Sequence, residues 1–194
     1  MTRITKPVEE RRQEIIDTAL ELFLKDGFEK TQMVDISKQI NVAAGTIYHY
    51  FKSKTELLYA VIDKLVEKKT KTNKMFNDSQ GSALDHLKLM LTSLEQSKAN
   101  NKLGDSLAND PVIIQYYMSK MRNASLPTLV SVIEKGNTDG SWKCEYPAET
   151  AVFILQGLTG VLSDELIKKD SLEEKRKRIK AYTNIIYRIL DKVE

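Results

Sequence analysis

The sequence is poor in residues that crosslink a chain or bind metals. It contains one cysteine, Cys144, and two histidines, His49 and His86. A single cysteine excludes an internal disulfide and any metal site built from several thiolates. The two histidines are far apart and lack a carboxylate-flanked ligand motif, which argues against a zinc or iron site. We therefore expect neither a metal nor a cofactor.

Long hydrophobic runs and known catalytic motifs are also missing. No apolar stretch reaches the roughly 18 residues of a membrane span, and residues 1–7 carry charge without the apolar core of a signal peptide. No Ser-His-Asp set, HExxH, P-loop or GxGxxG pattern is present, which argues against an α-helical enzyme. These absences predict a cytoplasmic protein that is not an enzyme and contacts no membrane.

Residues that break regular structure are few. The 194 residues include only 4 prolines and 8 glycines, and these are clustered. Hydrophobic residues make up 41% and charged residues 29%, with many Leu, Ile, Lys and Glu in the uninterrupted segments. This composition is typical of a folded all-α protein. The net charge of +3 is too small to indicate a nucleic-acid partner by itself.

The functional prediction depends on residues 41–54. Ile47 and Phe51 are four residues apart, so they share one helix face and can enter a core. The side chains left outside are Thr46, Tyr48, His49 and Tyr50, with Lys52 and Lys54 directly behind them. Exposed hydroxyls, rings and lysines on a short helix suit a helix that lies in a groove of DNA.

Two further helices are expected before this segment. Hydrophobic spacing predicts the first over residues 8–25, and Thr31 or Gln32 can cap the second. Asn41 stands where the second helix must end sharply, and Asn adopts the left-handed conformation more readily than most residues. Two helices joined by a turn of about four residues form a helix-turn-helix.

Basic residues near the N-terminus leave two interpretations open. They are Arg3, Lys6, Arg11 and Arg12. Positive charge at the start of a helix opposes the helix dipole, so another interaction should favour it. A DNA phosphate backbone would do so, and a solvated arm is the alternative.

The helix after residue 53 should begin with a capping box. Ser53 is a suitable N-cap, and Glu56 stands three residues later. We expect this helix over residues 54–71. Its lysine-rich end is interpreted mainly as solvated, with DNA contact as the alternative. A loop is expected over residues 75–82.

More helices are expected in the remaining chain. One should cover residues 82–98, and a single helical turn is expected within residues 103–107. Asp110 and Pro111 form a cap for the next helix, which Pro127 should kink or break.

The last part of the chain predicts a turn and two helices. Gly136 and Gly140 should bound a turn that carries Trp142, and the last two helices should begin near Pro147 and Ser171.

Those two helices carry wide apolar faces. Gly157 and Gly160 would allow another helix to approach the first of them closely. The second has an apolar seam with steps of three and four residues, formed by Ile179, Tyr182, Ile186, Ile189 and Val193. Pairing with a second copy as a four-helix bundle would bury these faces. Packing on the monomer core is the alternative.

The N-terminal third resembles the DNA-binding domain of TetR-type transcriptional regulators. The match runs from about Arg12 to Leu58. It is carried by Arg12, Ile15, Ala19, Leu22, Phe23, Gly27, Phe28, Thr31, Ile36, Val42, Gly45, Thr46, Ile47, Tyr48, Tyr50, Phe51, Lys52, Ser53, Lys54, Glu56 and Leu57. The rest of the chain is similar to the family's helical regulatory domain only in general terms.

The resemblance implies an all-α protein with a three-helix helix-turn-helix domain joined by a long helix to a ligand-binding and dimerisation domain. Residues 1–54 would form the N-terminal arm and DNA-binding domain. Residues 55–194 would form the regulatory and dimerisation domain, including a connecting helix over 55–72. Residues 43–49 would be the recognition helix.

The family's DNA contacts fall on ten positions of this sequence. They are Gln32, Met33, Ala44, Gly45, Thr46, Tyr48, His49, Tyr50, Lys52 and Lys54. Gln32 and Met33 stand where the family often has Thr and Val, Asn41 replaces the usual glycine, and Ala43 also departs from the family pattern. Ala43 replaces the usual serine and removes an N-cap, and Ala44 can only touch a thymine methyl group or let the backbone approach. We therefore expect the helix mainly to grip phosphates, with few direct base contacts.

The resemblance also implies a small-molecule effector bound among the middle helices. Met and aromatic side chains would suit a largely apolar or aromatic molecule. The candidates are Phe76, His86, Met90, Tyr116, Tyr117, Met121, Trp142, Phe153 and Gln156. Each of them could instead be an ordinary core residue.

These inferences converge on a dimeric transcriptional repressor. An effector would release it from a pseudo-palindromic double-stranded DNA operator, and the homodimer would form through the last two helices. The alternative is a DNA-binding interaction protein that a protein partner controls.

Overall fold

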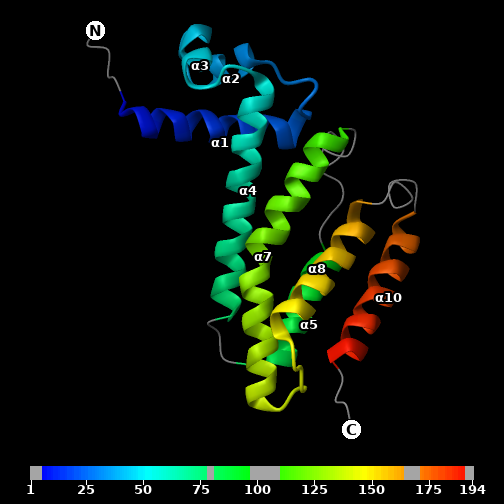
Figure 1. Cartoon of the computed structure of the whole chain (residues 1–194). Helices are drawn as coiled ribbons and strands as arrows, with labels where there is room; N and C mark the ends of the chain where they lie inside the picture. Colours follow the sequence, from blue (N-terminus) through cyan, green and yellow to red (C-terminus); the bar gives the residue numbers. More distant parts are fainter. Residues whose placement is uncertain (1–5, 78–80, 97–109, 164–170, 191–194) are drawn as a thin grey trace. The chain divides into compact units, whose positions relative to one another are not determined.

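The structure is a computed structural model that describes residues 6–77, 81–96, 110–163 and 171–190. Every regular element in these residues is an α-helix, which confirms the predicted all-α class. The helices are α1 (Val8–Asp26), α2 (Met33–Gln39), α3 (Ala44–Tyr50), α4 (Lys54–Asn77), α5 (Ala83–Gln96), α7 (Pro111–Asp139), α8 (Pro147–Ser163) and α10 (Leu172–Leu190) (Figure 1). The helical turn predicted within residues 103–107 lies outside the described residues. None of these helices is long and apolar enough to cross a membrane.

The described residues separate into two compact units. The N-terminal unit contains the chain up to Leu65 and the first residues of α7 as far as Ile113. The C-terminal unit contains the described residues from Val66 to Gln96 and from Ile114 onward. Each unit buries apolar side chains of its own.

The core of the N-terminal unit is built by α1, α2, α3 and the first half of α4. Ile15 and Phe23 of α1 are fully buried, as the helical spacing requires. Phe23 meets Phe28 edge to face, with ring centroids 5.3 Å apart. Ile47 of α3 and Phe51, which follows it, are also buried, so the predicted shared face of these two residues is confirmed.

Local motifs set the helix ends in this unit. Asn41 has a φ of 54°, the left-handed conformation that its position after α2 predicts. At the start of α4, the Ser53 Oγ accepts a hydrogen bond from the Glu56 N–H at 3.0 Å. The Glu56 carboxylate accepts one from the Lys52 N–H at 2.7 Å, so the capping box reaches back one residue further than predicted.

The core of the C-terminal unit joins α5, α7, α8 and α10, and α10 packs on both α5 and α8. One fully or almost fully buried side chain from each helix illustrates it: Leu87, Ile133, Ile154 and Ile186. Gly157 lets α8 and α10 approach closely, as predicted. A Cβ at Gly157 would lie 1.8 Å from the Tyr182 hydroxyl oxygen. That hydroxyl donates a hydrogen bond to the Ile154 carbonyl at 2.9 Å.

Two predicted helix ends are wrong. α4 continues to Asn77 instead of ending near residue 71, because residues 72–77 contain no glycine or proline. α7 is not broken at Pro127 but runs on to Asp139. Pro127 has no backbone N–H, so the carbonyl of Asn123 lacks its usual hydrogen-bond donor within the helix. Both residues are exposed, so water can hydrate that carbonyl.

The turn predicted between two glycines has only one of them. Gly140, with a φ of 77°, lies in the turn, whereas Gly136 is part of α7. Trp142 explains the difference, because a Cβ at Gly136 would lie 2.0 Å from its indole ring. The Trp142 Nε1 donates a hydrogen bond to the Ile133 carbonyl at 2.9 Å, which anchors the ring on the last turns of α7.

The residues of the seam predicted on α10 differ in burial within one copy of the chain. Ile186 is buried, as is Leu190 beside the seam, whereas Ile189 is 40% exposed. Pairing with a second copy, which the seam predicts, stays a prediction. Val193 lies outside the described residues.

Candidate functional site

α2 and α3 pack against each other and form the helix-turn-helix that the sequence predicts. The Val42 N–H in the turn between them donates a hydrogen bond to the Ser37 carbonyl at 2.9 Å. α3 starts without a side-chain cap, because its N-cap residue is Ala43. Its position depends instead on Ile47, which is fully buried.

One face of α3 points to solvent and carries most of the predicted DNA-contacting residues. Gly45, Tyr48, His49 and Lys52 are exposed, and half of the Tyr48 surface is accessible. Ala44, Thr46 and Tyr50 are half-buried at its edges. The Tyr50 ring meets the His49 ring edge to face at 5.3 Å, which orders the two rings relative to each other.

The predicted contacts from α2 differ from each other. Gln32 is exposed and caps α2, with its N–H donating a hydrogen bond to the Asp35 carboxylate at 2.9 Å. Met33 is only 5% exposed and belongs to the core of the unit. Of these two residues, only Gln32 is therefore accessible to DNA.

Lys54 makes internal contacts that sequence reasoning missed. Its ammonium donates hydrogen bonds to the carbonyls of Phe28 (2.9 Å), Glu29 (3.2 Å) and Thr31 (3.2 Å). It also lies 4.3 Å from the centre of the Phe28 ring, in cation–π geometry. The three donors of the ammonium are thus directed into the turn between α1 and α2. No sequence signal at Lys54 itself distinguishes this role from a phosphate contact.

The basic residues at the start of α1 also make contacts within their own unit. The Glu14 carboxylate accepts hydrogen bonds from Lys6 at 2.8 Å and from Arg11 at 2.5 Å. The Lys6 hydrogen bond, together with the Arg11 charge, lowers the pKa of Glu14. Arg12 lies 5.1 Å from the centre of the Phe51 ring. Lys6, Arg11 and Arg12 thus each have an interaction partner within the protein that can favour positive charge at the start of this helix. Arg3 lies outside the described residues.

The predicted ligand-binding residues of the C-terminal unit differ in their burial. His86 and Trp142 are buried, whereas Phe153 and Gln156 are exposed on α8. The other described candidates, all half-buried, are Met90, Tyr116, Tyr117 and Met121. Burial raises the pKa of Tyr117, as expected for a phenol with little access to water. The Phe76 side chain lies outside the described part.

The described part of this unit includes a groove and a smaller cavity. An open apolar groove of about 420 Å³ is lined by Leu126, Val130, Ala148, Glu149, Val152, Phe153 and Gln156. A second cavity, of about 370 Å³, lies between α7 and α8 and involves none of the predicted residues. Its signal in the sequence is the spacing of Ile114, Met118 and Arg122, which places a charge in an otherwise apolar stripe of a helix.

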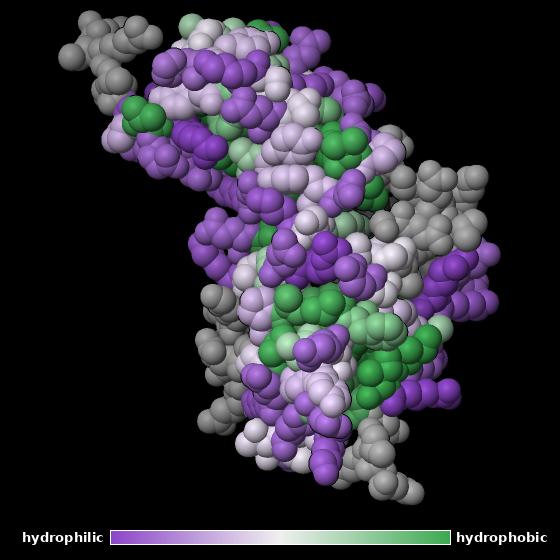
Figure 2. Space-filling model, in the orientation of Figure 1, coloured by the Kyte–Doolittle hydropathy of each residue, from purple (hydrophilic) through white to green (hydrophobic). Residues whose placement is uncertain are grey.

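The surface of the C-terminal unit has a different character from that of α3. Figure 2 shows hydrophobic surface gathered over α8 and α10. Its exposed apolar side chains include Val152 and Phe153 on α8 and Ile185 and Ile189 on α10. No cluster of His, Cys, Asp or Glu suited to a metal ion occurs among the residues with described positions.

Comparison with known proteins gives the N-terminal unit a family. Residues 15–61 match the family described as bacterial regulatory proteins, tetR family. An HTH-type transcriptional regulator of Staphylococcus aureus (strain USA300) is 33% identical over 97 residues, which is 50% of this chain and 52% of that protein. The HTH-type transcriptional repressor KstR of Rhodococcus jostii (strain RHA1) is 32% identical over 94 residues, 48% of this chain and 43% of KstR. The chain thus spans about half the length of the curated relatives that it matches.

Solved structures resemble the chain over almost its whole length. A transcriptional regulator from Cytophaga hutchinsonii ATCC 33406 superposes with a TM-score of 0.75 at 22% identity, covering 92% of this chain and 97% of that one. RolR in complex with resorcinol superposes with a TM-score of 0.68 at 15% identity, covering 94% and 88%. At these identities the likeness concerns the fold.

Proposed function

The chain belongs to the TetR family of bacterial regulatory proteins, and from that premise we propose that it is a dimeric repressor that a small molecule releases from DNA. The observation that carries the proposal is the exposed face of α3. It presents rings and a lysine on a helix-turn-helix whose opposite side is buried through Ile47. A cytoplasmic location, where bacterial DNA lies, follows from the same proposal.

In this proposal, α3 enters the major groove of the operator. Tyr48, His49 and Lys52 are exposed and can reach phosphates and base edges, and Gln32 can add a contact from the start of α2. Gly45 and Ala44 would let the backbone come close, with Thr46 and Tyr50 at the edges of the contact. Met33 and Lys54 would then act by holding the turn and the core beneath this face.

We assign the DNA-binding domain to residues 1–54 and the regulatory and dimerisation domain to residues 55–194. α4 connects the two parts. Its first turns also close the core of the N-terminal unit through Leu57, Leu58 and Val61. A change in the direction of α4 would therefore move α3, which is how an effector could alter DNA binding.

The homodimer is proposed to form through α8 and α10. Phe153 is 64% exposed and Ile185 is 49% exposed, an arrangement that association with a second copy would bury. Such a homodimer would carry two α3 helices, which the proposal assigns to successive major grooves about 34–36 Å apart. The effector is proposed to be a small, largely apolar or aromatic molecule bound in the C-terminal unit.

Footprinting on DNA selected from a random library tests the proposal. We expect protection with dyad symmetry, and loss of about 1–3 kcal/mol of binding free energy for Tyr48→Ala. Tyr146→Ala is the matched control, because Tyr146 is similarly exposed but lies just before α8. Protection without dyad symmetry, or equal affinities of the two variants, would overturn the proposal.

Sedimentation tests the dimer separately. Phe153→Lys should convert the dimer to monomers, because a charge would lie in the apolar contact. Leu89→Lys serves as control, since Leu89 is an exposed apolar residue of α5. A Phe153→Lys protein that remains dimeric would rule out this face.

A further inference from the structure

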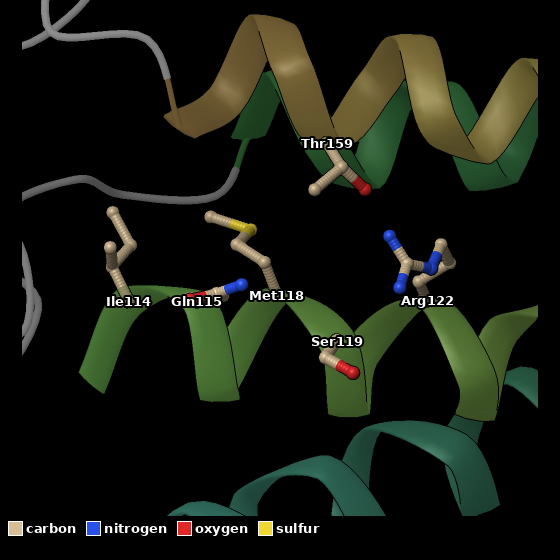
Figure 3. A pocket seen from close by; sticks show the side chains of 6 residues that line it. All are labelled: Ile114, Gln115, Met118, Ser119, Arg122 and Thr159. Atoms are coloured by element: carbon tan, nitrogen blue, oxygen red, sulfur yellow. The ribbon is translucent and has the colours of Figure 1, made fainter. Parts of the chain in front are cut away.

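The cavity between α7 and α8 has an unusual mixture of side chains. Figure 3 shows Ile114, Gln115, Met118, Ser119 and Arg122 on α7, with Thr159 pointing toward them from α8. Ile114, Met118 and Arg122 follow at intervals of four residues, so they form one stripe of α7. The cavity volume of about 370 Å³ is at the lower end of the range for ligand sites, roughly 300–1,000 Å³. A molecule that fits it is small.

Among the described residues that line this cavity, Arg122 is the only charged one. It is half-buried, and its Nη1 donates a hydrogen bond to the Gln156 Oε1 at 2.9 Å. Gln156 is a neutral amide, so it satisfies a donor but leaves the positive charge uncompensated. Among the side chains that the structure describes, no carboxylate forms an ion pair with Arg122.

A guanidinium in this setting favours a particular kind of ligand. Its planar donors match the two oxygens of a carboxylate, and partial burial strengthens such a pair relative to water. One positive charge balances one negative charge, which favours a monoanion over a phosphate dianion. The apolar ends of Ile114 and Met118 suit a hydrocarbon or aromatic body.

We propose that this cavity binds a small organic carboxylate, with its carboxylate on Arg122 and its apolar body between Ile114 and Met118. This rests on the proposed function, because the carboxylate would be the effector of the repressor. It narrows the effector from an apolar or aromatic molecule to an acid with an apolar body.

Calorimetric titration of the full chain at neutral pH tests the charge requirement. The probes are benzoate, 2-naphthoate and octanoate, each compared with its primary amide, which has nearly the same shape but no charge. At least one carboxylate should bind about tenfold or more tightly than its amide, the difference expected for loss of a charge-assisted pair. Equal binding of acid and amide, or no binding by any of the acids, overturns the proposal.

Variants of Arg122 test its location. Arg122→Met should abolish the preference for acid over amide, and Arg122→Lys should restore part of it, since lysine keeps the charge but not the planar fork. Arg176→Met, which removes an exposed charge from α10, should bind the acid as the wild type does. Unchanged acid binding by Arg122→Met would place the site elsewhere. Circular dichroism of each variant confirms that it is folded.

DNA binding in the same samples separates the two proposals. Carboxylate binding that depends on Arg122 and weakens the affinity for selected DNA supports both. Carboxylate binding with unchanged DNA affinity supports the site and overturns its role as effector site. Failure of the chain to bind any selected DNA overturns the proposed function, whereas carboxylate binding is still decided by the titrations.

Discussion

The two units of this protein expose different kinds of surface. In the N-terminal unit, Tyr48 and His49 of α3 and Lys52 just after it are exposed, and the apolar residue that precedes them in sequence, Ile47, is buried. In the C-terminal unit, α8 and α10 expose apolar side chains such as Phe153 and Ile185. A polar, basic face suits phosphates and base edges, whereas an apolar face suits a second protein surface. The contrast supports the proposal that one unit binds DNA and the other associates with a second copy.

Neighbouring residues within a unit also differ in exposure and in their hydrogen bonds. Lys52 and Lys54 are two positions apart, yet Lys52 is exposed and Lys54 donates to three carbonyls of the turn before α2. Proximity to α3 is therefore a poor guide to whether a lysine side chain is exposed.

The largest expected difference in the free energy of unfolding is between alanine variants of Ile47 and Tyr48. Ile47→Ala should lower the free energy of unfolding of the N-terminal unit by about 2–5 kcal/mol, because it leaves a cavity in the core. Tyr48→Ala should stay within about 0.5 kcal/mol of the wild type and lose DNA affinity instead. Urea denaturation followed by far-UV circular dichroism measures both. Trp142 fluorescence reports the C-terminal unit alone, so it should not respond to either change.

The next difference is between two glycines of α8. Gly157→Ala should destabilise the C-terminal unit by about 1–3 kcal/mol, because its Cβ would meet the Tyr182 hydroxyl. At Gly160 no described atom lies within 4 Å of the position that a Cβ would take, so Gly160→Ala should stabilise α8 by up to about 1 kcal/mol through helix propensity. Denaturation followed by Trp142 fluorescence gives both values. Equal signs for the two variants would contradict the close packing of α8 and α10.

Variants of Lys52 and Lys54 should differ in the salt dependence of their DNA affinity. Lys52→Met should reduce the slope of log affinity against log salt by about 1.8 for the proposed dimer, since each of the two copies loses one phosphate contact worth about 0.9. Lys54→Met should leave that slope unchanged and cost about 1 kcal/mol of stability, because water can rehydrate the partly exposed carbonyls. DNA titrations at several salt concentrations, with denaturation of each variant, decide between the two. A reduced slope for Lys54→Met would show that it contacts phosphate after all.

The smallest expected effect concerns Asp85 at the start of α5. Hydrogen bonds from the Ser82 hydroxyl and backbone N–H lower the pKa of the Asp85 carboxyl. A lowered folded-state pKa contributes stability above the unfolded value of 3.8, and this contribution is lost as the pH falls through the folded value. Ser82→Ala should raise the pKa of Asp85 in an NMR titration. The pKa of Glu174, lowered in the same way by Ser171, should not change.

Much of the N-terminal unit could be predicted because its signals are local. The Ser53–Glu56 cap, the left-handed Asn41 and the shared face of Ile47 and Phe51 each depend on residues within four positions of one another. Met33 and Lys54 could not be placed in this way. The contacts of Lys54 include Phe28 and Thr31, which only the fold brings next to α4.

The C-terminal unit was less predictable because its decisive contacts are distant in sequence. Pro127 did not end α7, since its face of the helix is open to water. Gly136 belongs to α7 because the Trp142 ring covers it. Arg122 could not be singled out because a charge on a helix is normally solvated, and only the approach of α8 encloses it in a cavity.

The sequence by itself determined the all-α class, the helix-turn-helix and the face of α3 that looks outward, because helical periodicity and capping act over a few residues. The tertiary structure decided which lysine beside that helix stays available, which apolar residues of α10 remain exposed and where a charged cavity forms. These outcomes depend on contacts between side chains that are distant in sequence, and residue spacing does not predict which of those contacts form.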